Sequence, residues 1–66
     1  MQANVIRGKI IERFGTLTKF ATEIGWTPNK VSRVLRGQQE LSATDIKQFS
    51  LALKISEPSD VVALFL

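Results

Sequence analysis

The side chains with the clearest binding chemistry occur close together, between Gly25 and Gln39, a stretch that contains no acidic residue. An arginine can form two hydrogen bonds to O6 and N7 of guanine, and an asparagine can do the same to N6 and N7 of adenine. In a helix, Asn29 and Arg33 share one face because they are four residues apart. This spacing predicts a face that contacts neighbouring base pairs. The polar and basic residues concerned are Asn29, Lys30, Arg33 and Arg36.

The basic excess of the chain is confined to this stretch. The 66 residues include 9 Lys and Arg against 6 Asp and Glu, which gives a net charge of +3. Outside residues 25–39, cations and acids are equal in number. Such a cluster is typical of a surface that binds nucleic acid, although a solvated helix face can have the same composition.

Apolar residues that recur at steps of three and four predict five helices and no strand, within a single domain. We expect the helices at about 3–14, 17–24, 28–36, 43–53 and 58–65. The inner face of the first helix is assigned to Val5, Ile6, Ile10, Ile11 and Phe14. The apolar side of the fourth is assigned to Ile46, Phe49, Leu51, Ala52 and Leu53.

The most informative segment is 16–37, where two short helical patterns meet at a tight glycine turn. Ala21 is small enough to let the two helices approach closely, and Gly25 can adopt the positive φ that ends the first of them. Val31 closes the angle from the second helix. Trp26 is expected to fill the space between the helices rather than to stack on a base.

This segment resembles the helix-turn-helix of the phage Cro and repressor family, the XRE-like DNA-binding domains, and the surrounding helices extend the resemblance over most of the chain. The resemblance implies an all-α, compact, five-helix, lambda-repressor-like DNA-binding domain that covers residues 1–66. It also implies a transcriptional regulator of a phage, a prophage or a similar mobile element, closer to Cro than to a full repressor. Such a protein would act in the cytoplasm of a bacterial host cell and bind a palindromic operator as a homodimer.

In this scheme the third helix enters the major groove, which is about 12 Å wide and admits one α-helix. Phosphates are expected at helix starts, where free backbone N–H groups and the positive end of the helix dipole attract anions. Base contacts are expected from Thr27, Pro28, Asn29, Lys30 and Arg33. Phosphate contacts are expected from Thr16, Thr18, Lys19, Ser32, Arg36, Gln38 and Gln39. The threonines can also serve as helix N-caps, a role that is compatible with phosphate binding.

Three positions depart from the family pattern. Leu17 stands where many relatives carry a glutamine that bonds both a phosphate and the recognition helix, and a leucine can do neither. Pro28 stands where relatives often have a polar residue that contacts a base, which shifts base contact further along the helix. Lys54 occupies the place of a frequent C-capping glycine, so either the helix ends differently or the backbone is strained.

The apolar end of the chain predicts a contact with a second copy. A domain of this size cannot easily bury every apolar side chain of the sequence VVALFL. We expect Val62, Phe65 and Leu66 to form part of a two-fold symmetric dimer contact.

Other classes of function find little support in the composition. The chain has no Cys, His or Tyr, which removes disulfides, thiol or imidazole catalysis and nearly every zinc or haem site. No motif frames a nucleophile, so we expect no enzyme, no metal, no cofactor and no small-molecule ligand. The first residues lack the pattern of a signal peptide and no apolar run approaches about 20 residues, so we expect neither a signal peptide nor a membrane segment.

The main alternative is a protein-interaction module. A helix-turn-helix domain could modulate another regulator without binding DNA specifically. Leu17, Pro28 and the apolar C-terminal end could serve such contacts.

Overall fold

The computed structural model describes residues 1–66, and all of its secondary structure is α-helical. The five helices are α1 (Ala3–Phe14), α2 (Leu17–Ile24), α3 (Pro28–Leu35), α4 (Ala43–Ala52) and α5 (Pro58–Phe65). The five predicted helices are therefore confirmed; α3 and α4 each end one residue earlier than expected, because Arg36 and Leu53 are their C-caps. None of these helices is both long and apolar enough to span a membrane.

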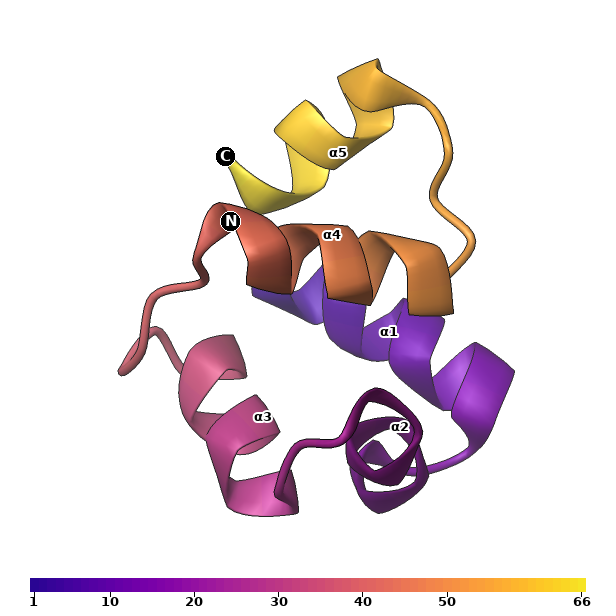
Figure 1. Cartoon of the computed structure of the whole chain (residues 1–66), viewed down its shortest axis with the longest axis vertical. Helices are drawn as coiled ribbons and strands as arrows, with labels where there is room; N and C mark the ends of the chain where they lie inside the picture. The colour runs from indigo at the N-terminus through magenta and orange to yellow at the C-terminus, as the bar shows by residue number, and fades with distance from the viewer.

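The helices form one bundle in which α2 packs against three others. Helix α1 packs against α2, α3 and α5, and α2 also packs against α3 and α4. In Figure 1, α2 and α3 lie at one end of the molecule and α5 at the other, with α1 and α4 between them. The chain ends are joined because the backbone N–H of Gln2 donates to the carbonyl of Leu64, with 2.8 Å between N and O.

An aromatic cluster forms the centre of the core. The ring of Phe49 in α4 meets that of Phe20 in α2 edge to face, with 5.0 Å between the centroids. It also meets Trp26 at 5.1 Å and Phe65 at 6.2 Å. Phe20 and Phe49 are completely buried. One side chain of α4 therefore connects α2, the turn before α3, and α5.

Two helices present different faces from those expected. Val5 and Ile11 of α1 are each 44% exposed, and Leu51 of α4 is 69% exposed. On α1 the fully buried positions are Ile6 and Ile10, which are one turn apart, and Val5 and Ile11 lie at the edges of that stripe. Leu51 is two residues from both Phe49 and Leu53 and therefore points away from the core. The inward assignment of these three residues was wrong.

Three helices, α2, α3 and α4, end in the same backbone motif, in which a residue with positive φ and the residue after it both donate N–H groups back to carbonyls of the last helical turn. After α3, Gly37 has a φ of 75°, and its N–H donates to Val34 while that of Gln38 donates to Arg33. After α4, Lys54 has a φ of 56°, and the same pair of bonds is present. This is the Schellman arrangement, which favours glycine at the positive-φ position. Of the two alternatives for Lys54, the structure has the strained backbone.

We expect Lys54→Gly to raise the free energy of unfolding by about 1 kcal/mol, because glycine adopts positive φ without a clash at Cβ. The control is Lys54→Ala, which removes the charge but keeps Cβ and should change stability little. Chemical denaturation of the two variants makes the comparison. Equal stabilities for the two variants would show that the backbone at position 54 carries no strain.

We expect Ser50→Ala to stabilise the fold by about 1 kcal/mol, because a buried hydroxyl without a partner costs desolvation energy. Ser50 is 6% exposed, and its Oγ has no hydrogen-bond partner. Thermal unfolding should show a higher midpoint for this variant than for the exposed-site control Ser56→Ala. A lower midpoint for Ser50→Ala would mean that the hydroxyl is satisfied in solution.

Candidate nucleic-acid interface

A tight turn sets the direction in which α3 leaves α2. Gly25 is left-handed, with a φ of 76°, and the N–H of Trp26 donates to the carbonyl of Ala21 at 2.8 Å. Because the Trp26 ring packs on Phe49, the turn is attached to the core directly after the glycine. Ala21 and Val31 are completely buried, as their proposed role in close helix packing requires. The turn is therefore held by the Trp26 contact with Phe49 and by the close packing of α2 and α3 at Ala21 and Val31.

Helix α3 has one buried face and one exposed face. Val31 and Val34 are completely buried, and Leu35 is nearly so, and together they form the inward side of the helix. Asn29 and Arg33 are exposed, and Arg36 follows them on the same side at a spacing of four and three residues. The buried face fixes the rotation of the helix about its axis. Asn29 and Arg33, which are predicted to contact neighbouring bases, therefore point outward together with Arg36.

The start of α3 is capped by its own side chains. Thr27 Oγ1 accepts a hydrogen bond from the N–H of Lys30, with 3.2 Å between the atoms, and Pro28 occupies the first helical position. Thr27 and Pro28 are both exposed. The N-cap role of Thr27 is confirmed, and its hydroxyl hydrogen is left available for a further acceptor.

Lys30 lies apart from the outward face that Asn29 and Arg33 share. Its Nζ is 4.0 Å from the centroid of the Trp26 ring, a cation–π contact, and the side chain is half-buried. The sequence offered no sign of this pairing beyond the spacing of four residues between Trp26 and Lys30. A contact of this kind is worth about 0.5–1 kcal/mol at an exposed site, which a phosphate could overcome. The structure thus turns the Lys30 side chain toward Trp26, whereas Asn29 and Arg33 are exposed.

The predicted phosphate contacts of α2 lie at its first turn. Thr16 is the N-cap, and its Oγ1 accepts from the N–H of Lys19 at 3.1 Å. Thr16, Thr18 and Lys19 are all exposed, which leaves a free cation beside the positive end of the helix dipole. Leu17, between them, is half-buried against the core and does not join this polar group.

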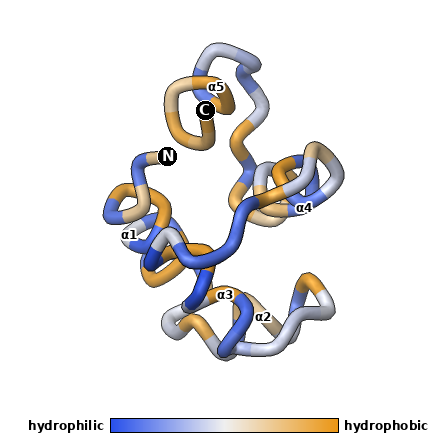
Figure 2. The backbone as a smooth tube through the Cα atoms, turned by 90° about the vertical axis from the view of Figure 1, so that its left-hand side faces the viewer, coloured by the Kyte–Doolittle hydropathy of each residue, from blue (hydrophilic) through white to orange (hydrophobic).

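The other predicted phosphate contacts lie on and after α3. Figure 2 shows that the connection following this helix is strongly hydrophilic. Arg36 and Gln38 are exposed, whereas Ser32 and Gln39 are half-buried. Gln39 Oε1 accepts a hydrogen bond from Arg33 Nε, with 3.4 Å between the atoms. The structure thus joins a predicted base contact to a predicted phosphate contact, a pairing that the sequence analysis missed.

The predicted dimer residues are divided between surface and core. Val62 is 55% exposed and Leu66 is 79% exposed, so both are available to a second copy. Phe65 is only 6% exposed and packs on Phe49, so its assignment to a dimer contact is corrected to a core role. The reason is helical spacing, since Val62 and Leu66 are four residues apart and Phe65 lies on the adjacent, inward side.

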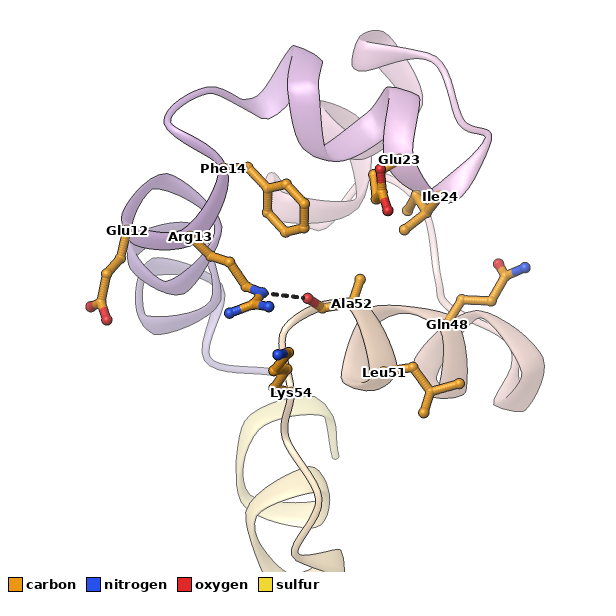
Figure 3. Close-up of a pocket in the computed structure, with 9 residues that line it drawn as sticks. All are labelled: Glu12, Arg13, Phe14, Glu23, Ile24, Gln48, Leu51, Ala52 and Lys54. Atoms are coloured by element: carbon orange, nitrogen blue, oxygen red, sulfur yellow. Dashed lines mark hydrogen bonds between the residues drawn. The ribbon is translucent and has the colours of Figure 1, made fainter.

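The largest groove of the molecule lies elsewhere. It has a volume of about 840 Å³ and lies between the C-terminal ends of α1, α2 and α4, with no residue from α3 (Figure 3). Phe14, Ile24 and Ala52 form much of its apolar lining. Inside it, Arg13 Nε donates to the carbonyl of Ala52 at 3.0 Å and so satisfies the end of α4. The arginine acts there as a structural cap.

No family model, curated protein or solved structure matches the chain. The assignment of the candidate interface is therefore supported by the residues of the chain and their geometry alone. Asn29, Arg33 and Arg36 offer hydrogen-bond donors and positive charge on one outward side of α3. Lys19 adds a further cation at the start of α2. Such a surface can bind an extended polyanion and can form directed bonds to base edges.

Proposed function

We propose that this chain binds double-stranded DNA in a sequence-specific manner, with α3 as the recognition helix. The observation that carries the proposal is the shared exposed face of Asn29, Arg33 and Arg36, opposite a fully buried face, in a stretch without acids. Asn29 and Arg33 supply the base contacts, since their side chains suit adenine and guanine edges. Arg36, Lys19 and the capped start of α2 supply phosphate contacts.

The biological role that we propose is transcriptional control. It rests on the resemblance of residues 16–37 to phage Cro and repressor proteins and on the five-helix arrangement around them. The regulator would belong to a phage, a prophage or a similar element and would act in the bacterial cytoplasm. With two copies on the duplex, the recognition helices would enter major grooves about 34 Å apart, and the operator would be palindromic.

In vitro selection from random duplexes at physiological salt tests this function. We expect a palindromic consensus whose two halves are about one helical turn apart. The alternative is a protein-interaction module that uses Leu17, Pro28 and the apolar C-terminal end, of which Pro28, Val62 and Leu66 are exposed. Weak binding without any enriched sequence would favour that alternative and reject specific DNA recognition.

Two arginine variants separate base contact from phosphate contact. Arg33→Ala should cost about 1–3 kcal/mol on the selected operator and relax the preference at one base pair. Arg36→Ala should weaken binding to all sequences alike and lower the slope of log affinity against log salt by about one unit. Titrations at several salt concentrations give both quantities. If the two variants behaved identically on operator and random DNA, the assignment of Arg33 to a base would be wrong.

A second copy should bind through the exposed end of α5. Replacing Val62 and Leu66 together by serine removes two exposed apolar side chains and should weaken dimerisation by about tenfold or more. Sedimentation at high micromolar concentration, with and without the selected duplex, measures the effect. Leu51→Ser is the control, because Leu51 is 69% exposed on a different helix. A monomeric unaltered chain under both conditions would exclude the dimer.

A further inference from the structure

Arg33 is attached to the connection after α3 by both its backbone and its side chain. Its carbonyl accepts a hydrogen bond from the N–H of Gln38 at 2.9 Å, and its Nε donates to Gln39 Oε1 at 3.4 Å. The first bond belongs to the Schellman turn that Gly37 makes possible. The turn folds the connection back over the last turn of α3, which places the Gln39 amide beside the Arg33 guanidinium.

Gln39 differs from its neighbours in burial. Its side chain is half-buried, whereas its neighbours Gln38 and Glu40 are exposed. A side chain restricted in this way loses less conformational freedom when it forms a bond. The partly buried amide oxygen therefore costs less conformational freedom as a partner for the guanidinium than a fully exposed glutamine would.

Because Gln39 bonds to Arg33 Nε, it determines which N–H donors of Arg33 stay available for DNA. A guanidinium carries five N–H donors in a rigid planar fork, one of them on Nε. With Nε bonded to Gln39, the two terminal nitrogens remain, and they are the pair that can meet O6 and N7 of guanine end-on. A fork held at its base also has fewer orientations in which it could bond to a different base or to a phosphate.

We propose that Gln39 is a positioning residue that holds the Arg33 guanidinium by its Nε and thereby determines the guanine preference of the recognition helix. The proposal deepens the proposed function and rests on it. It replaces the expectation that Gln39 binds a phosphate itself. The two roles differ in one respect: a positioning residue acts only through Arg33, whereas a phosphate contact acts independently of it.

A double-mutant cycle on the selected operator tests this dependence. Gln39→Ala should lower operator affinity about fivefold and reduce the preference for guanine at the base pair assigned to Arg33. In the Arg33→Ala background, Gln39→Ala should have no further effect. Gln38→Ala is the matched control, because Gln38 contributes only its backbone to Arg33, and it should leave the base preference unchanged.

The conservative variant Gln39→Glu provides the rescue. A carboxylate still accepts from Nε, so the guanine preference should be retained, although its negative charge lowers affinity for every duplex. A loss of about equal size for Gln39→Ala in both backgrounds, with guanine preference intact, would overturn the proposal and restore the phosphate role. Thermal unfolding of each variant confirms that the fold is unchanged.

The outcome also distinguishes this inference from the function on which it rests. If the unaltered chain enriches no sequence, the proposed function fails and the positioning role fails with it. If the chain selects an operator and the cycle is additive, only the role of Gln39 is rejected.

Discussion

The packing of aromatic rings around Phe49 is the interaction on which the rest of the structure depends. Phe49 is completely buried and meets Phe20, Trp26 and Phe65 edge to face. Each such pair contributes about 0.5–1.5 kcal/mol beyond the burial of its apolar area. Since the three partners belong to α2, to the turn before α3 and to α5, one side chain positions three parts of a small core.

The candidate interface depends on this cluster through Trp26. The ring of Trp26 anchors the turn that directs α3, and its outer side receives the ammonium of Lys30. The exposed side of α3 is thus oriented by the packing of Trp26 on Phe49, although none of its own residues takes part in that contact. A change in the core at Phe49 would alter the presentation of Asn29 and Arg33 without touching either residue.

Much of the fold could be predicted from local patterns. Helix limits followed from caps and glycines, because these act within one turn of the chain; Thr16 and Thr27 both form N-caps as expected. Errors arose where an apolar residue beside a buried one was also placed inside, as with Leu51. A short helix in a small bundle buries only a narrow stripe, so apolar type alone does not assign a face.

The sequence by itself determined the five helices, the glycine turn between α2 and α3, and the absence of acids from the stretch that contains Arg33 and Arg36. These features depend on neighbours within a few residues, and local physical chemistry is sufficient to predict them. Only the tertiary structure decided that Lys30 lies over Trp26, that Phe65 belongs to the core and that Gln39 meets Arg33. The Phe65 contact depends on how helices pack, and the other two depend on the directions that side chains take at a turn, which the spacing of residues alone does not specify.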